Sequence, residues 1–300
     1  MLVRHEKDRQ IVLIGSMTRA PKILVFDSGL GGLTVFREVT RLRPDAEFLY
    51  VADDAVFPYG GLGEAALVAR VGEVVARLVE SFEPDVVVVA CNTASTLVLP
   101  HLREQHAEIP FVGTVPAIKP AAAQSQSRMI SVLATPGTVA RDYTHDLVRT
   151  YAAHCDVTLV GSTQLAGLAE AFMRGAVPPD AVIGAEISPC FVADGDRRTD
   201  CVVLACTHYP LLLDHFERLA PWPVAWIDPA SAIARRTDHV LTEVLGFSRD
   251  GGTPPRPPVA LFTSAAEPSG ELRQALRQLG IETTSSGSLA PTQAWALSQA

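Results

Sequence analysis

Two cysteines in this sequence stand in closely similar surroundings, one in each half of the chain. Cys91 follows the apolar run of VVVVACNTAS (86–95), and Cys206 follows that of VVLACTHYP (202–210). Each is followed by hydrogen-bonding residues, Asn-Thr in the first stretch and Thr-His in the second. The pKa of a free thiol, about 8.5, falls toward neutral pH beside an imidazolium or a helix N-terminus. The pattern therefore predicts two reactive thiols at the ends of two strands.

Two thiols on opposite sides of one cleft suit a reaction that inverts a carbon centre. A thiolate on one face removes the α-proton, and a thiol on the other face returns a proton, so that the configuration is reversed. General acid–base catalysis of this kind typically contributes ~10²–10⁴-fold, and preorganised donors that stabilise the carbanion-like state must supply the rest. The scheme needs no pyridoxal and no other cofactor. We interpret Cys91 and Cys206 as its two bases.

Several polar residues at the strand ends are suited to bind a substrate carboxylate. Together with backbone N–H groups at helix N-termini, the candidate donors are Ser28, Asn92, Thr93 and Thr207. His208, two residues after Cys206, is placed to favour the thiolate, although a histidine taken alone is as often structural as functional. FPYGG (57–61) predicts a rigid turn, in which Tyr59 offers a hydroxyl to the cleft.

Zinc binding and disulfide formation are two other uses of cysteine, and the spacing argues against both. Cysteine and histidine are common zinc ligands, but Cys-x-His is not a usual zinc spacing, and Cys91 lies in the other half of the chain. The five cysteines have no framework spacing, which indicates free thiols in a reducing compartment. Cys155, Cys190 and Cys201 are interpreted as small buried hydrophobic residues. We expect no metal site and no disulfide.

A glycine-rich stretch, DSGLGGLTV (27–35), is similar to a dinucleotide-binding turn. The dinucleotide motif needs three glycines at fixed spacing and an acidic residue about 20 positions later. Gly29 and Gly31 fit the first pair, but Thr34 occupies the third glycine position. We interpret the glycines as sites where the backbone approaches a small ligand closely, or as plain turn geometry.

Composition and charge indicate a globular chain without a nucleic-acid or membrane role. Hydrophobic residues make up 48% of the 300 residues, which is ample for a large buried core. The net charge is −8, and no cluster of Lys and Arg could follow a phosphate backbone. The apolar piece IVLIG (11–15) is too short for a signal peptide or a membrane span. We therefore expect a cytoplasmic protein.

Apolar runs of strand length alternate with segments of helical period, which is typical of parallel sheets with crossover helices. In the first part of the chain we predict strands over 22–27, 47–53 and 85–91 and helices over 33–42 and 63–82. In the second part we predict strands over 129–135, 156–162 and 200–206 and helices over 138–152 and 164–174. A short strand and a helix follow over 226–245, and the strand VALFTS and a helix over 268–279 follow the GGTPPRPP loop (251–258).

These elements predict an α/β protein of two similar three-layer domains with mostly parallel sheets, related by a pseudo-twofold axis. The first domain is discontinuous, with residues 21–117 and 224–283, and the second spans 118–223. Residues 1–20 are interpreted as an N-terminal extension and residues 284–300 as a tail. Functional groups gather at the carboxyl ends of parallel strands, so we expect the active site at the interface between the domains.

Seven stretches of the sequence form an ordered set of motifs. They are FDSGLGGLTV (26–35), DDAVFPYG (53–60), ACNTAS (90–95), VPAIKPA (115–121), ATPGTV (134–139), ACTHYPLL (205–212) and IDPASAIARR (227–236). Through this set, which is highly specific, the chain resembles the bacterial glutamate racemases from about residue 22 to residue 280. That family belongs to the cofactor-independent aspartate/glutamate racemase superfamily. The resemblance implies cofactor-independent interconversion of L- and D-glutamate, which supplies D-glutamate for peptidoglycan.

The resemblance also implies roles for single residues. Cys91 would act on D-glutamate and Cys206 on L-glutamate, with Asp27 assisting the first thiol and His208 the second. Glu170, within GLAEA, matches a further acidic helper, and an exposed helix carboxylate is the plain alternative for it. The implied substrate contacts are Asp27, Ser28, Tyr59, Gly60, Asn92, Thr93, Thr207 and His208.

The chain departs from the family pattern in the loop before Pro58. Many relatives have Gly-Asp-Thr-Ala-Arg where this chain has ADDAV (52–56), so Asp54 and Val56 replace a threonine and a basic residue. This change affects the electrostatics of the loop and not the expected reaction. Pro229 likewise follows Asp228 where serine is more usual.

Other functions stay open at the level of sequence. An aspartate or hydantoin racemase belongs to the same superfamily, and the PYG, CNTA and CTHYP stretches favour glutamate. A non-catalytic regulator is an alternative from another class, since some relatives also bind DNA gyrase, and the presence of both Cys91 and Cys206 argues against it. Members of the family often form dimers in differing arrangements, so a homodimer is an expectation from the resemblance.

Overall fold

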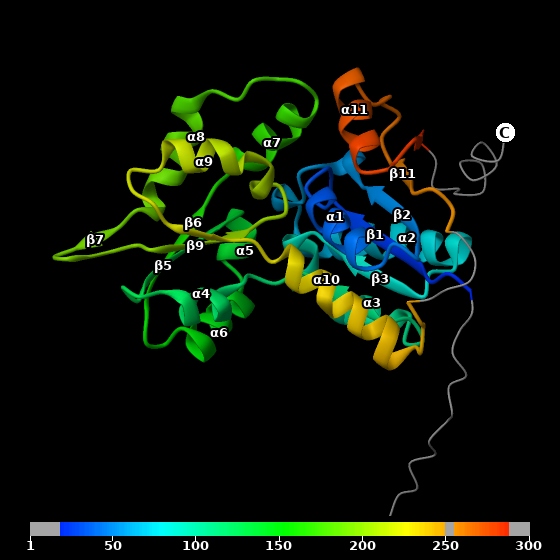
Figure 1. Cartoon of the computed structure of the whole chain (residues 1–300), viewed down its shortest axis with the longest axis horizontal. Coiled ribbons are helices and arrows are strands. Elements are labelled where there is room, and N and C mark those ends of the chain that lie inside the picture. The colour runs from blue at the N-terminus through cyan, green and yellow to red at the C-terminus, as the bar shows by residue number, and fades with distance from the viewer. Residues whose placement is uncertain (1–18, 250–254, 288–300) are drawn as a thin grey trace, which may run out of the picture.

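Two parallel sheets organise the structure, a computed structural model that describes residues 19–249 and 255–287. One sheet has six strands in the order β12-β11-β2-β1-β3-β4, and the other has four in the order β10-β9-β5-β6. We call the six-stranded sheet with its helices the larger lobe and the four-stranded sheet with its helices the smaller lobe (Figure 1). The predicted α/β class with mostly parallel sheets is confirmed.

The strands of the larger lobe are largely buried on both faces. They are β1 (Lys22–Asp27), β2 (Glu47–Ala52), β3 (Val86–Val89), β4 (Phe111–Gly113), β11 (Val259–Phe262) and β12 (Thr283–Ser286). In β1, Ile23 and Val25 pack into one layer of the core, while Leu24 and Phe26 pack into the other. A strand covered on both faces has no polar side, which explains the continuous valine run of β3.

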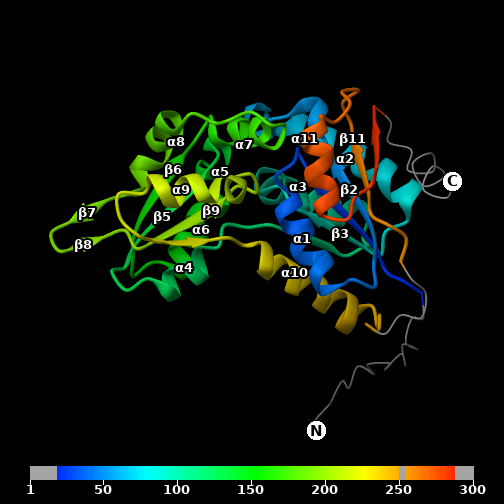
Figure 2. The ribbon, with the colours of Figure 1, turned by 45° about the horizontal axis from the view of Figure 1, so that its top comes forward.

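Helices cover both faces of the larger sheet (Figure 2). One face packs against α1 (Leu33–Leu42), α10 (Ala230–His239) and α11 (Gly270–Gln278), and the other against α2 (Glu64–Phe82) and α3 (Asn92–Gln105). In α2 the buried residues recur at helical spacing, as Leu67, Val71, Val74 and Leu78 show. This apolar stripe fixes which side of α2 faces the sheet.

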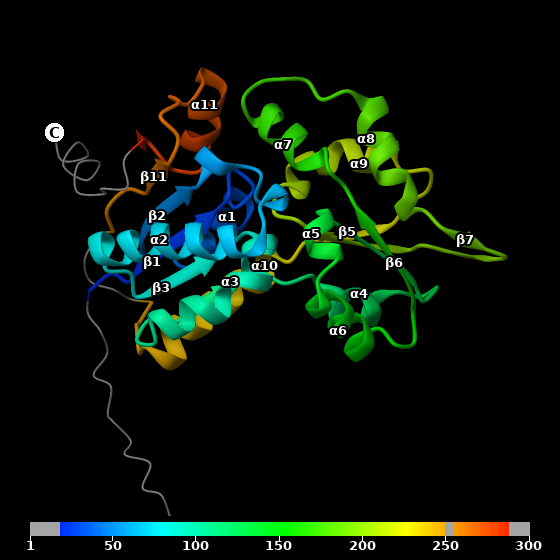
Figure 3. The same cartoon turned by 180° about the vertical axis from the view of Figure 1, so that it is seen from behind.

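The smaller lobe repeats the three-layer arrangement on a shorter sheet. Its strands are β5 (Met129–Ala134), β6 (Asp156–Gly161), β9 (Cys201–Ala205) and β10 (Ala225–Ile227), and an antiparallel hairpin is formed by β7 (Ala193–Asp194) and β8 (Arg197–Arg198). Its helices are α4 (Ile118–Gln124), α5 (Pro136–Val139), α6 (Asp142–Tyr151), α7 (Leu165–Met173), α8 (Asp180–Ile187) and α9 (Leu213–Leu219). Helices α7, α8 and α9 cover one face, and α4 and α6 cover the other (Figure 3).

Two predicted features differ in the structure, and α4, α8, α9, β4 and the β7–β8 hairpin were not predicted from the sequence. The helix predicted over 138–152 is two helices, because α5 is capped by the Thr135 side chain and the Thr138 carbonyl accepts a hydrogen bond from the Thr144 hydroxyl instead of continuing the ladder. The prediction of a tail from residue 284 was wrong for residues 284–286, which belong to β12 and pair with β11. A strand made only of Thr and Ser has no apolar alternation to reveal it.

The chain crosses between the lobes twice. After β10 pairs with β9 in the smaller sheet, it returns to the larger lobe beyond Ile227, slightly later than the predicted boundary at 224. The two-domain boundaries themselves stay a prediction. Most of the predicted extension and tail, and residues 251–254 of the predicted loop, lie outside the described residues.

Candidate active site

The two predicted thiols line one cavity between the lobes. Cys91 follows β3 and occupies the N-cap position of α3, while Cys206 follows β9. Only 5% of Cys91 and 7% of Cys206 is exposed. The space that they line measures about 20 Å³. The structure therefore brings together two cysteines that are distant in sequence and belong to different sheets.

Most of the predicted substrate-contact residues line the same cavity. Its wall consists of Ser28, Phe57, Pro58, Tyr59, Gly60, Cys91, Asn92, Thr93, Thr135, Ala166, Cys206, Thr207 and His208. Phe57, Pro58, Thr135 and Ala166 are not among the site residues predicted from the sequence, and the ATPGTV stretch is the signal that could have found Thr135. Asp27 and Glu170 lie behind the wall, where they contact Thr207 and His208 respectively.

His208 links Cys206 to Glu170. Its Nδ1 lies 3.9 Å from the Cys206 Sγ, and its Nε2 lies 2.8 Å from Glu170 Oε1. Burial by itself lowers the pKa of His208, but the contacts with Cys206 and Glu170 outweigh burial and raise this pKa well above its ordinary value. Burial favours a higher pKa for Glu170, but the hydrogen bond to His208 reverses the effect, so the Glu170 pKa is lowered. The pair is therefore an imidazolium and a carboxylate at neutral pH.

Asp27 governs the other thiol. It is fully buried, and it accepts hydrogen bonds from the Gly29 backbone N–H and the Thr207 hydroxyl, each at 3.1 Å. Burial raises the pKa of Asp27. Burial, and then the charge of Asp27, raises the pKa of Cys91 to about 12. Cys91 therefore keeps its proton at neutral pH, in the form that can protonate a substrate.

Asn92 carries unpaired polar atoms at the cavity. Its side chain is buried at the first position of α3, and neither Oδ1 nor Nδ2 has a hydrogen-bond partner. Buried polar groups are nearly always paired, so an unpaired amide needs an explanation. Because Asn92 lines the cavity beside Cys91 and Thr93, a bound polar ligand would supply the missing partner.

The glycine-rich turn after β1 passes against side chains of the smaller lobe. A Cβ atom on Gly29 would lie 2.2 Å from Glu170 Oε1, and one on Gly31 would lie 2.5 Å from His208 Nδ1 and 2.7 Å from Thr207 Oγ1. The close approach expected from the sequence is therefore present, but its partners are protein side chains. Any larger residue would displace the group that contacts Cys206.

The Tyr59 hydroxyl is turned away from its predicted role. It donates a hydrogen bond to Asp53 Oδ2 at 2.7 Å, and Asp53 is also bound by Arg70 and Thr263. Tyr59 still lines the cavity, next to Gly60. Tyr59 thus shapes the wall, while its polar end stabilises the loop behind it.

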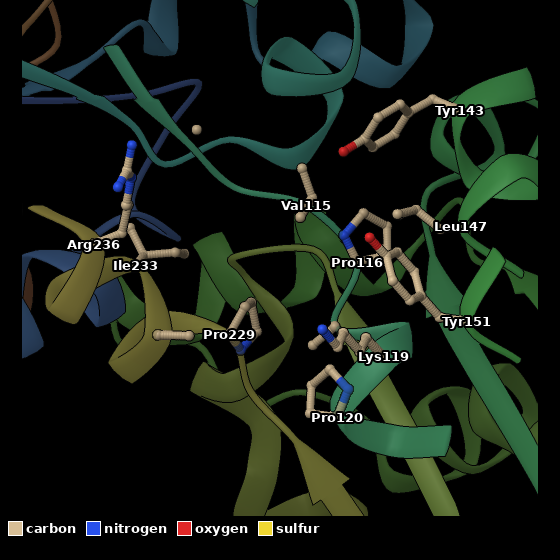
Figure 4. Close-up of a pocket in the computed structure, with 13 residues that line it drawn as sticks. Val115, Pro116, Lys119, Pro120, Tyr143, Leu147, Tyr151, Pro229, Ile233 and Arg236 are labelled. Atoms are coloured by element: carbon tan, nitrogen blue, oxygen red, sulfur yellow. The ribbon is translucent and has the colours of Figure 1, made fainter. Parts of the chain in front are cut away.

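A second, more open cavity measures about 360 Å³. Figure 4 shows side chains that line it. Lys119 of α4, Tyr143 and Tyr151 of α6 and Arg236 of α10 contribute to its wall. It therefore lies where the smaller lobe meets α10 of the larger lobe. Neither cysteine lines it, so we give it no part in the chemistry of the thiols.

The described ranges contain no metal cluster and no membrane helix. Within residues 19–249 and 255–287, no group of three or more His, Cys, Asp or Glu side chains could hold a metal ion. No helix in these same ranges is long and apolar enough to cross a lipid bilayer. All five cysteines are free thiols, and Cys190 and Cys201 are buried in the smaller lobe.

Known proteins with similar sequences and structures point to one family. Residues 36–237 match the family model described as Asp/Glu/Hydantoin racemase. A glutamate racemase of Brucella anthropi is 58% identical over 219 residues, which cover 73% of this chain and 79% of that protein. A glutamate racemase of Sinorhizobium medicae is 51% identical over 272 residues, which cover 91% of this chain and 98% of that protein.

The same likeness appears among solved structures. The Escherichia coli glutamate racemase, in complex with L-glutamate and the activator UDP-MurNAc-Ala, superimposes with a TM-score of 0.80 and 37% identity. The superposition covers 89% of this chain and 98% of that one. Both lobes of the present structure are therefore included in the match.

Proposed function

The chain belongs to the Asp/Glu/hydantoin racemase family, and we propose that it interconverts L- and D-glutamate by proton transfer between Cys91 and Cys206. It is an amino-acid racemase and hence an isomerase. Glutamate as the substrate is supported by the glutamate racemases that match nearly the whole chain. The observation that carries the mechanism is the single cavity lined by both thiols.

In the proposed reaction, Cys206 removes the α-proton of L-glutamate and Cys91 protonates the opposite face. The His208 imidazolium, with its Nδ1 3.9 Å from the Cys206 sulfur, stabilises the Cys206 thiolate. Cys91, with a pKa of about 12, carries the proton that is delivered. After the transfer Cys91 is the thiolate and Cys206 the thiol, and this state accepts D-glutamate. The charge of Asp27 makes the Cys91 thiolate a stronger base.

The polar wall is assigned to holding the substrate and stabilising the carbanion-like state. Asn92 has a free amide, and further hydroxyl donors in the wall are Ser28, Thr93 and Thr207. Backbone N–H groups at the start of α3, beside Cys91, add a fixed positive dipole that favours a carboxylate. Donors fixed in place before the reaction lower the barrier most effectively.

A cytoplasmic location fits the five free thiols, which a reducing compartment maintains. There the D-glutamate formed would supply peptidoglycan synthesis, as the family resemblance implies. The resemblance also suggests a homodimer, and sedimentation of the protein at several concentrations tests this assembly directly.

The reaction is tested by incubating the protein with each glutamate enantiomer in D₂O, without added cofactor. We expect deuterium to enter the α-carbon, which NMR detects. We also expect the optical rotation to decay to zero, whichever enantiomer is supplied. L- and D-aspartate serve as comparison substrates, because an aspartate racemase is the nearest alternative. Absence of both signals with glutamate would remove the assignment, and faster turnover of aspartate would favour the alternative.

The two-base scheme predicts that Cys91→Ala and Cys206→Ala each lower the rate of racemisation by at least ~10²-fold, the lower range for loss of general acid–base catalysis. Each variant lacks either the base or the acid for any given enantiomer. Cys155→Ala is the matched control, since Cys155 is a half-buried thiol outside the cavity. Near-normal turnover in either active-site variant would contradict the scheme.

A further inference from the structure

The second carboxylate oxygen of Glu170 faces an arginine. Glu170 Oε1 is bound to His208, while Oε2 lies 3.6 Å from Arg174 Nη2, one turn further along and just beyond the end of α7. The same Nη2 lies 3.7 Å from Asp54 Oδ2. Arg174 belongs to the smaller lobe and Asp54 follows β2 of the larger lobe. The Arg174 guanidinium therefore lies between two carboxylates that come from different lobes. We call Glu170, Arg174 and Asp54 together the bridge.

Asp54 is held firmly on its own side of this bridge. Its Oδ1 accepts the Ser264 backbone N–H at 2.8 Å, and its Oδ2 accepts the Ser264 hydroxyl at 2.7 Å. Only 9% of the Asp54 side chain is exposed. Because Ser264 follows β11, the Asp54 carboxylate is fixed relative to the larger sheet. Asp54 is thus a rigid anchor for the guanidinium.

The end of α7 that carries Arg174 also packs closely against the larger lobe. Gly175 has φ +96°, and a Cβ atom on it would lie 2.8 Å from the Cγ of Glu271 in α11. The Arg174 carbonyl accepts a hydrogen bond from the Ser269 hydroxyl at 3.5 Å. Helices α7 and α11 lie side by side in two views (Figure 1 and Figure 2). The bridge therefore lies within a real contact between the lobes.

We propose that Arg174 and Asp54 are positioning residues, which hold Glu170 and through it the His208 imidazolium against Cys206 when the lobes are closed. The proposal rests on the proposed racemase function. A carboxylate bound through one oxygen can rotate, and a cation at the other oxygen restrains that rotation. Asp54 in turn keeps Arg174 in place, although a third of the arginine side chain is exposed and its charges are partly screened.

Several charged groups face this bridge, and their signs make the proposal testable. Glu170 faces His208 and Arg174, and His208 also faces Cys206 and Asp27. If Arg174 acted on Cys206 by its charge alone, removing the positive charge of Arg174 and removing the negative charge of Asp54 would change the reactivity of the Cys206 thiol in opposite directions. If the two residues act as one bridge, both changes loosen Glu170 and act in the same direction.

The experiment compares Arg174→Met, Asp54→Asn and the double variant with the unchanged protein. We expect kcat to fall roughly 10-fold in Arg174→Met, within the cost of a displaced catalytic group, and less in Asp54→Asn. The kcat of the double variant should fall no further than that of Arg174→Met, because both substitutions break the same bridge. Arg174→Lys keeps the charge and should restore most of the activity.

A second readout follows the thiol itself. The rate of Cys206 alkylation by iodoacetamide is measured against pH by mass spectrometry of the Cys206 peptide. We expect its midpoint to move upward in both Arg174→Met and Asp54→Asn, because a looser His208 supports the thiolate less. The alkylation measurement needs no turnover, so it tests the bridge even if the unchanged protein does not racemise glutamate. Failure to racemise glutamate would refute the proposed function separately.

The matched control is Arg77→Met, which removes an exposed arginine paired with Glu73 on α2. Thermal unfolding shows which variants are folded. If Arg174→Met does not fold, the results for Asp54→Asn and Arg174→Lys decide whether the bridge acts as proposed. The bridge is refuted if Arg174→Met behaves like Arg77→Met. It is equally refuted if the alkylation midpoints of Arg174→Met and Asp54→Asn move in opposite directions.

Discussion

Gly31 lets the turn after β1 pass directly against the residues around Cys206. A Cβ atom there would lie 2.6 Å from the His208 backbone N, as well as 2.5 Å from its ring. A flexible side-chain tip could move aside, but a backbone atom held by a strand end cannot. Gly31 does not have a positive φ angle, so the packing of the two lobes, and not the conformation of the turn, requires a glycine.

We expect Gly31→Ala to lower kcat by roughly 100-fold, because the added methyl group pushes His208 away from Cys206 and a shift of about 1 Å can cost that much. Gly61→Ala in the same lobe is the control, since a Cβ atom on Gly61 meets nothing within 4 Å. Racemisation assays and thermal unfolding of both variants give the comparison. Similar turnover in the two would show that the His208 position does not depend on Gly31.

The sequence predicts which residues meet at the cavity better than how their side chains point. Cys91, Cys206 and their neighbours were predictable because parallel strands place their carboxyl ends together. The direction of the Tyr59 hydroxyl was not predictable, because its partner Asp53 is itself held by Arg70, 17 residues away, and Thr263, 210 residues away. Such partners become visible only when the chain is folded.

At the scale of elements, α2 holds the loop that forms one wall of the cavity. Arg70 of α2 contacts Asp53 through Nε at 2.9 Å and Nη2 at 2.5 Å. Asp53 is fully buried and also accepts the hydroxyl hydrogens of Tyr59 and Thr263. The carboxylate therefore ties together the end of β2, the cavity wall, α2 and the segment after β11.

Arg70→Met should destabilise this junction, because it leaves a buried carboxylate without its cation. We expect the free energy of unfolding to fall by about 1–3 kcal/mol, the usual cost of removing one partner of a buried hydrogen-bonded group. The KM for glutamate should rise, since Tyr59 and Gly60 lose their support. Urea unfolding and steady-state kinetics measure the two effects. Arg77→Met, on the exposed face of the same helix, should change neither quantity, and equal behaviour of the two variants would contradict the assigned role.

The prediction of helices and strands succeeded where the apolar residues form a continuous run or a clear period. It failed where backbone pairing with a neighbouring strand determines the structure. The strand at 22–27 and the helix at 33–42 have the predicted bounds, because each carries a continuous or periodic apolar signal. Strand β4 has only three residues, and β12 has no apolar side chain. Both lie at sheet edges, where backbone pairing with a neighbour is sufficient and the sequence carries little signal.

At the scale of the whole molecule, the described structure is closed around its site. A cavity must offer about 10–15 Å³ to hold one water molecule, and the space lined by the two thiols measures about 20 Å³. An amino acid cannot enter a space of that size without movement of its walls. Because the walls come from both lobes, we infer that substrate entry and product release require the lobes to separate.

A cross-link between the lobes tests this requirement. A Cβ atom on Gly60 of the larger lobe would lie 3.6 Å from the Cβ of Thr135 in the smaller lobe. The two Cβ atoms of a natural disulfide lie about 3.5–4.5 Å apart, so this pair of positions is suited to a cross-link. We expect the double variant Gly60→Cys/Thr135→Cys to lose at least ~90% of its activity when oxidised, because the cavity is locked shut. Reduction with dithiothreitol should restore the activity.

The decisive comparison is between the oxidised and reduced forms of the same double variant, because both substitutions lie in the cavity wall. Each single variant and the unchanged protein are treated with the same oxidant, which controls for damage to Cys91 and Cys206. Mass spectrometry under non-reducing conditions establishes that the cross-link has formed. Full activity of a completely cross-linked sample would mean that glutamate reaches the thiols by movement of one lobe's loops alone, and the lobes could then remain together throughout the catalytic cycle.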